Sequence, residues 1–315
     1  MRKLNKSNKT IDEAFELVKK GCHNPKKDFL KDNEKILKDA YKDYDQKARE
    51  GKLHELRSLW SDGEGKDYII EIKGSSTNEF HAYCEVANST YNSSLKFVDT
   101  LWEELETINS LTGIREEIIC PICGLRKCGQ LDHHAPRAVT MFPEYSSHFS
   151  NLVPLCDDCN ETKKDYWTDN EDGVTKRIWF NPYFDSLPDF DIFVPKIEIL
   201  LGLPKAKVSL NNLLDRSNNV HDVICRTIEH LNLLKKYDSA LEIELNSFEE
   251  REILAYQKEK SRYKDAQDYC NSMCERIDDL LKKGKRQTMM EIFLYKAILT
   301  SPDYKDWMIE ELQKH

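Results

Sequence analysis

The centre of the chain carries two Cys-x-x-Cys pairs, Cys120-Pro121-Ile122-Cys123 and Cys156-Asp157-Asp158-Cys159. Each pair turns the backbone so that its two sulfur atoms face one point, and four thiolates at such spacing are typical of a tetrahedral zinc site. A bound zinc ion would join segments that cannot otherwise fold together. The linker over residues 124–155 is longer than in a simple zinc ribbon, so we expect it to carry further structure. Buried free cysteines are the alternative interpretation.

Length and composition indicate a polar, mostly helical, soluble chain. It has 315 residues, of which 33% are charged and 39% hydrophobic, and this length suits about two domains. No run approaches the roughly 18 apolar residues of a membrane span, and polar residues follow the basic N-terminus where a secretory signal would be apolar. We therefore expect a cytoplasmic protein whose ten cysteines are reduced. The net charge of −9 counts against a passive nucleic-acid binder with a basic surface.

The chain has three parts that differ in pattern. Residues 1–111 carry apolar residues at helical spacing, interrupted by a β-rich run that predicts a short strand or hairpin near 66–73. Residues 112–185 lose this periodicity and concentrate cysteine, histidine, proline and asparagine, as expected of a loop-rich module that bears a site. Residues 186–315 return to helical spacing at 210–214, 220–234 and 248–281. We predict a mainly α chain with a small central module, and α+β overall.

The groups that phosphodiester hydrolysis needs lie around the second cysteine pair. The sequence has Leu131-Asp132-His133-His134-Ala135-Pro136 before this pair and Cys159-Asn160-Glu161-Thr162-Lys163 at its end. An imidazole suits a general base at neutral pH, and a divalent cation can neutralise phosphoryl oxygens. Asp132 and Asn160 offer the oxygen ligands that Mg²⁺ or Mn²⁺ prefers. The sequence therefore predicts a second, catalytic metal site beside the zinc site.

Basic residues near this predicted site are candidates for contact with substrate phosphate. The second cysteine pair predicts a helix that begins at 156 or 157 and runs to about 167. On such a helix Asn160 shares a face with Lys163 and Lys164, at i+3 and i+4. We predict that both lysines bind substrate phosphate, and Arg137 is a third candidate. Contacts of this kind would be sensitive to salt and blind to sequence.

Strand geometry decides which histidine can share a site with Asp132. In a regular strand Asp132 and His133 point to opposite faces, so both serve one site only if the strand ends or bends there. If the strand continues, Asp132 and His134 share a face instead. The residues alone leave both assignments open.

The order D-H-x-x-P, followed by N-L-x-x-L-C-x-x-C-N-x-x-K, resembles the HNH endonucleases, or ββα-metal group, in their zinc-bearing form. Every position of this pattern is filled, and the resemblance covers about Cys120–Tyr166. It implies a zinc-stapled ββα-metal core that hydrolyses DNA to 5′-phosphate and 3′-hydroxyl ends. It also implies His133 as the general base, Asp132 and Asn160 on the Mg²⁺ or Mn²⁺ ion, and Asn151 as the residue that orients the loop of the base.

A second, shorter resemblance lies downstream. The segments 180–185 and 227–233 are similar to the HNH subunit of Septu-type bacterial anti-phage systems, which also ends with a helical lobe. Asn181 stands where that family has an aspartate. This resemblance implies an ATPase as partner protein and a role in anti-phage defence.

Two other functions fit the same residues. A non-catalytic zinc adaptor would recruit an ATPase or a nucleic acid, and a partner-dependent nuclease would be silent alone. One site makes one cut, so a monomer would nick DNA, and a double-strand break would need an oligomer or two successive binding events.

The pattern does not distinguish DNA from RNA or define sequence specificity. Glu71-Ile72-Lys73 also mimics the E-x-K of another nuclease class, which is weak evidence on one edge strand.

Overall fold

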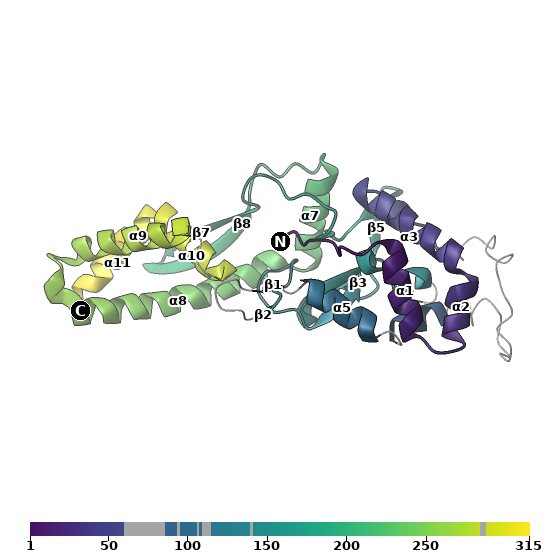
Figure 1. The fold of residues 1–315 in the computed structure, drawn as a ribbon. Helices are drawn as coiled ribbons and strands as arrows, with labels where there is room; N and C mark the ends of the chain where they lie inside the picture. The colour runs from purple at the N-terminus through teal and green to yellow at the C-terminus, as the bar shows by residue number, and fades with distance from the viewer. Residues whose placement is uncertain (60–85, 93–94, 106, 109–114, 139–140, 284–287) are drawn as a thin grey trace. The chain divides into compact units, whose positions relative to one another are not determined.

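A computed structural model describes residues 1–59, 86–92, 95–105, 107–108, 115–138, 141–283 and 288–315 (Figure 1). The predicted strand near 66–73, with Glu71 and Lys73, lies outside these residues. The chain forms two compact units. The first contains residues 1–187 and 217–231, and the second contains residues 188–216 and 232–315. This division differs from the three predicted parts, because the first two share one unit, which also takes a helix from the third.

Helices from the N-terminal region build most of the core of the first unit. They are α1 (Ile11–Gly21), α2 (Lys26–Asp32), α3 (Glu34–Arg49) and α5 (Leu95–Leu105), with a short 3₁₀ turn η1 (Leu53–Glu55). A capping box of Thr10 and Glu13 starts α1. The apolar faces of these helices share one buried cluster with the strands and loops of the central module; its members include Phe15, Tyr41, Tyr44, Phe97, Leu131, Ala135 and Leu152.

The central module has a strand–strand–helix order. Its elements are β1 (Thr107–Ile108), β2 (Arg115–Glu116), β3 (Gln130–His133), η3 (Pro143–Tyr145), η4 (Phe149–Asn151), β4 (Leu152–Leu155) and α6 (Asp157–Lys163). β1 pairs with β2, and β3 pairs antiparallel with β4 so that His133 lies opposite Leu152. Cys156 is the N-cap of α6, and Asp157 and Asp158 occupy its first turn, where carboxylates favour the positive end of the helix dipole.

A hairpin and one helix complete the first unit. β5 (Thr168–Glu171) and β6 (Val174–Arg177) pair antiparallel around Asp172-Gly173, and both turn residues have positive φ, as a two-residue hairpin turn requires. α7 (Asn219–His230) carries Arg226, whose guanidinium donates to both carboxylate oxygens of Glu171 at 2.7 and 2.6 Å. The Thr227 hydroxyl joins α7 to the backbone at 178 and 180.

The second unit contains a hairpin that the sequence did not predict. β7 (Phe193–Leu200) and β8 (Leu203–Leu210) form an antiparallel pair, and residues 211–214, predicted as helix, are not helical. The remaining elements are α8 (Leu233–Glu259), η5 (Lys260–Arg262), α9 (Ala266–Lys283), α10 (Met289–Thr300) and α11 (Pro302–Gln313). α10 packs on β7 and α8 on β8, around the rings of Phe193, Tyr237 and Phe293.

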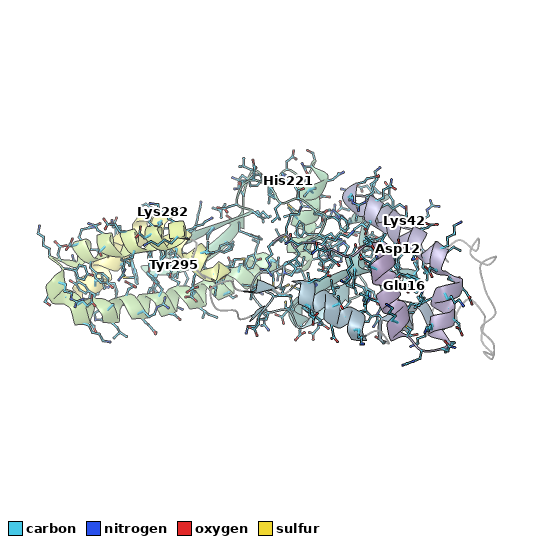
Figure 2. The ribbon with its side chains drawn as sticks, viewed as in Figure 1. Asp12, Glu16, Lys42, His221, Lys282 and Tyr295 are labelled. Atoms are coloured by element: carbon cyan, nitrogen blue, oxygen red, sulfur yellow. The ribbon has the colours of Figure 1, made fainter. Side chains whose placement is uncertain are left out.

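Charged side chains cover the outer faces of the helices. Lys38 pairs with Asp12 at 2.7 Å and Lys42 with Asp39 at 2.9 Å, and Figure 2 shows Asp12 and Lys42 among many such groups. Exposed pairs of this kind contribute no more than about 1 kcal/mol each. Among the described segments, every helix is too short or too polar for a bilayer crossing. The chain is thus mainly helical with small antiparallel sheets, which agrees with the predicted α+β class.

Candidate metal centre and active site

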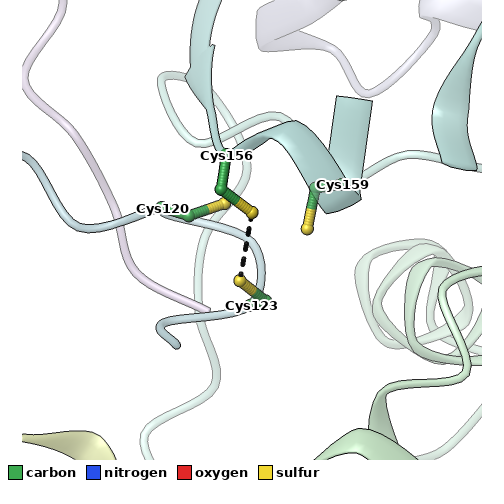
Figure 3. Close-up of side chains that lie close together, drawn as sticks. All are labelled: Cys120, Cys123, Cys156 and Cys159. Atoms are coloured by element: carbon green, nitrogen blue, oxygen red, sulfur yellow. Dashed lines mark hydrogen bonds between the residues drawn. The ribbon is translucent and has the colours of Figure 1, made fainter. Parts of the chain in front are cut away.

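The four cysteines of the two Cys-x-x-Cys pairs converge on one point. Cys120 and Cys123 lie in the turn before β3, Cys156 follows β4, and Cys159 lies in the first turn of α6 (Figure 3). All four are buried, and their sulfur atoms lie within 4.8 Å of one another. The sulfur atoms of Cys123 and Cys156 are 3.7 Å apart. A tetrahedral ion with metal–sulfur bonds of about 2.3 Å requires about 3.8 Å, so the cluster can hold a structural metal such as zinc.

His133 ends β3, and its ring is fixed by a backbone carbonyl. The side chain is 6% exposed, and Nε2 lies 2.8 Å from the carbonyl oxygen of Ser146. A carbonyl only accepts, so Nε2 carries the proton and the lone pair is on Nδ1. The ring of Tyr91 meets the His133 ring edge-on, with 4.9 Å between centroids. Burial lowers the pKa of His133 to about 3, so the ring is neutral at pH 7.

The side chain of Asn151 forms hydrogen bonds to the loop that follows His133. Its side chain is fully buried. Oδ1 accepts from the backbone nitrogen of Ala135 at 2.6 Å, and Nδ2 donates to the carbonyl oxygens of Ala135 and Tyr145 at 3.0 and 3.1 Å. The carbonyl of Asn151 also accepts from the backbone nitrogen of His134 at 2.7 Å. Asn151 therefore joins the backbone at Ala135 to the backbone at Tyr145.

Asp132 and His134 line a shared cavity that His133 does not line. The cavity has a volume of about 10 Å³, which is room for about one water molecule. Asp132 Oδ2 lies 2.9 Å from Nζ of Lys163, which lines the same cavity. Nε2 of His134 is buried and has no hydrogen-bond partner among the described residues. Burial holds the pKa of His134 far below its usual value. Asp132 and His133 therefore share no cavity, whereas Asp132 and His134, the alternative pair, do.

The prediction that Lys163 binds substrate phosphate requires correction. Its side chain is 5% exposed and its ammonium group pairs with Asp132. Nζ also donates to the carbonyl oxygen of His133 at 2.8 Å. Because the ammonium group of Lys163 is bound by the Asp132 carboxylate and the His133 carbonyl oxygen, it faces the cavity. It is therefore not available to a phosphate outside.

Lys164 does not share the helix face predicted for it. α6 ends at Lys163, short of the predicted end near 167, because Lys164 has φ 45° and ψ −132°. Its side chain is exposed, so the ammonium group is accessible to a ligand. A non-glycine residue with this backbone conformation is strained by about 1–3 kcal/mol.

Arg137 and Asn160 are placed differently from each other. Arg137 donates from Nη1 to the carbonyl oxygen of Asn88 and to Oδ1 of Asn92, both at 3.2 Å, and is partly exposed. Asn160 lies in the middle of α6 and is half-buried. The amide of Asn160 and the carboxylate of Asp132 are of the type that suits Mg²⁺. Within the described residues, only the four cysteines form a group of three or more metal-ligating side chains of the His, Cys, Asp or Glu type.

The sequence missed the neighbours of His133. Ser146 supplies the carbonyl that binds its ring, and Tyr91 supplies the aromatic contact from residues 86–92. Neither residue belongs to the motif, and the contacts join positions 13 or more residues apart, so no local pattern marks them. No protein-family model matches the chain, and neither a curated protein nor a solved structure matches it.

Proposed function

We propose that this chain is a metal-dependent endonuclease of the HNH type that hydrolyses phosphodiester bonds in DNA. The support is the order of elements together with the residues they carry: Asp132 and His133 end β3, Asn151 precedes β4, and Asn160 lies on α6. The Cys-x-x-Cys pairs flank this arrangement, and we propose zinc as the structural ion that joins them.

The observation that carries the proposal is the hydrogen bond from His133 Nε2 to the Ser146 carbonyl oxygen, at 2.8 Å. It commits the proton to Nε2 and leaves the lone pair on Nδ1, which is the state that a general base needs. The low pKa keeps the ring unprotonated but makes it a weak proton acceptor. The negative charge of a bound phosphate would raise this pKa toward neutrality.

The remaining residues have the following proposed roles. Asp132 and Asn160 would hold Mg²⁺ or Mn²⁺, with water and phosphate oxygens completing the coordination. That ion supplies charge stabilisation for the phosphoryl oxygens. Lys163 neutralises the Asp132 carboxylate at 2.9 Å. Lys164, which is exposed, and Arg137, which is partly exposed, would contact the DNA backbone.

Incubation of supercoiled plasmid with the full chain tests the proposal. We expect nicked circles with Mg²⁺ or Mn²⁺ and none after excess EDTA, since the phosphoryl charge then lacks its cation. Product that forms in excess EDTA would contradict metal dependence. If the chain contains stoichiometric zinc and binds DNA but does not cleave it with any metal tested, the result would favour the non-catalytic zinc adaptor.

The pairing of Lys163 with Asp132 favours one variant of this function, a nuclease that a partner activates. An ammonium group beside the carboxylate competes with a divalent cation for the same oxygen. We propose an ATPase as this partner and anti-phage defence as its setting. Addition of such a partner to the plasmid assay should then increase nicking, and the increase should require His133.

A further inference from the structure

The helical segment 86–92 is bonded to the loop that orients His133. Ser146 donates from its hydroxyl to the carbonyl oxygen of Ala87 at 2.5 Å. The hydroxyl of Thr90 donates to the same carbonyl oxygen of Ala87 at 2.7 Å, and it lies 3.0 Å from the hydroxyl of Ser146 and 2.8 Å from that of Ser147. Thr90 and Ser146 are buried. Ser146 is the residue whose carbonyl oxygen accepts from His133 Nε2, so Thr90 lies against the side chain of the residue that selects the tautomer of the ring.

The same segment also contacts the ring of His133 directly. The Tyr91 ring stands edge-on to it, with planes at 77° and centroids 4.9 Å apart. The guanidinium of Arg137 lies over the Tyr91 ring at 4.9 Å, and Asn88 and Asn92 accept its hydrogen bonds. Tyr91 is therefore held between His133 and Arg137. Its contact limits rotation of the imidazole about χ2, which is otherwise a soft torsion.

We propose that Thr90 and Tyr91 are positioning residues for His133. Thr90 acts through the Ser146 carbonyl, and Tyr91 acts on the ring plane. This inference rests on the proposed function, because a general base must aim its lone pair at the attacked water, and a displacement of about 1 Å can reduce the rate about 100-fold. Both residues lie outside the motif-bearing part of the chain, so the N-terminal region would be part of the active site.

Two pairs of variants test these roles. Thr90→Val keeps the shape of the side chain and removes the hydroxyl, while Thr90→Ser keeps the hydroxyl. Tyr91→Leu removes the ring, while Tyr91→Phe keeps it. Two quantities are measured on the full chain: kcat and KM for plasmid nicking with Mn²⁺, and the ¹⁵N shifts of the His133 ring at one fixed pH, assigned by comparison with His133→Ala. The shifts report the tautomer whether or not the protein cleaves DNA.

We expect Thr90→Val to lower kcat about 10-fold with KM unchanged, since the substrate contacts remain. Tyr91→Leu should lower kcat by a similar factor and also raise KM, because Arg137 loses the ring that it packs on. The Nδ1 and Nε2 shifts of His133 should move toward each other in Thr90→Val, as both tautomers become populated. Thr90→Ser and Tyr91→Phe should restore wild-type values, which a general loss of folding would not do.

Wild-type kcat and wild-type ring shifts in both Thr90→Val and Tyr91→Leu would overturn the inference. If the wild-type chain does not nick plasmid under any condition, the proposed function fails, and the ring shifts still decide the positioning roles. If Thr90→Val loses its bound zinc and unfolds, kcat of Tyr91→Leu, at a half-exposed position, still decides the role of Tyr91, and a wild-type kcat there would overturn it.

Discussion

Lys164 combines backbone strain with an exposed charge next to the candidate active site. Its φ of 45° is in the region that favours glycine. Such strain persists where the surrounding structure imposes it, and it is common at functional sites. The turn at Lys164 ends α6, and the Lys164 side chain is exposed whereas that of Lys163 is buried.

Lys164→Gly should stabilise the protein and weaken DNA binding. We expect a gain of roughly 1 kcal/mol in the free energy of unfolding, because glycine adopts this conformation without strain. Urea denaturation measures the stability, and DNA affinity at several salt concentrations measures the binding. Lys164→Gln is the control: it should lose affinity without gaining stability. A glycine variant with unchanged affinity would remove Lys164 from the DNA interface.

At this scale the sequence identified residue types better than their partners. The sequence placed Asp132 and His133 at a strand and Asn160 on the helix after the second cysteine pair, and these residues lie on β3 and α6; their shared role in catalysis stays a prediction. The direction of Lys163 could not be predicted, because it depends on the Asp132 carboxylate and on the end of α6 one residue later. The role of the Ser146 carbonyl could not be predicted from sequence, because every residue has a backbone carbonyl.

Helix α8 carries a buried carboxylate in the second unit. Glu249 and Tyr304 come from α8 and α11, Glu249 Oε1 is shielded from water, and the Tyr304 hydroxyl interacts with the Glu249 carboxylate. Burial raises the pKa of Glu249 to about 7. The folded state therefore binds a proton more tightly than the unfolded chain does. The resulting stability is fully present below the unfolded pKa near 4.5 and is lost as the pH rises through about 7.

Glu249→Gln should stabilise the second unit at pH 8 and leave it nearly unchanged at pH 4. We expect a gain of about 1–2 kcal/mol at pH 8, discounted for partial solvent exposure, since a neutral amide is not penalised by burial as a carboxylate is. Hydrogen exchange of the α8 amides at several pH values measures this effect. The neighbouring Glu250 is exposed, so Glu250→Gln should show no such gain. Equal effects of the two variants would contradict the account.

At the scale of elements, two hairpins carry local sequence signals for turns and strands. β5–β6 turns at Asp172-Gly173, a dipeptide that favours tight hairpins. In β7, buried and exposed residues alternate from Phe193 to Glu198, and this period of two is typical of a strand. The β5–β6 signal lies in the part of the chain that was assigned to loops, and the β7 signal was outweighed by the helical periodicity around it. The long helices α8 and α9 followed that periodicity, so the helical part of the region was predictable.

At the scale of the molecule, the compact units do not divide at the predicted boundary near residue 111. Phe15 and Tyr44 share a buried cluster with Leu131 and Leu152, residues that are far apart in sequence. Burial of such surfaces contributes roughly 25 cal/mol per Å² of apolar area, so the N-terminal helices and the central module form one unit. Nothing in a local window of sequence reports which apolar faces will meet.

Removal of the metal should affect the first unit selectively. We expect about one zinc per chain, and Cys156→Ser should abolish it, because a hydroxyl is a poor ligand for zinc beside three thiolates. Mass spectrometry of bound metal and limited proteolysis of residues 115–187 measure the loss. Cys274→Ser on α9 is the matched control and should retain full zinc. Zinc that persists in Cys156→Ser would contradict the four-cysteine site.

The most direct measurement compares nicking of supercoiled plasmid by the wild type, His133→Ala and His134→Ala, each with Mn²⁺ and verified zinc content. If Nδ1 of His133 is the base, His133→Ala should lose at least about 100-fold in rate, while His134→Ala should keep most of it. Loss confined to His134→Ala would assign the base to the ring that shares a cavity with Asp132. Full activity in both variants would contradict a histidine-dependent hydrolysis altogether.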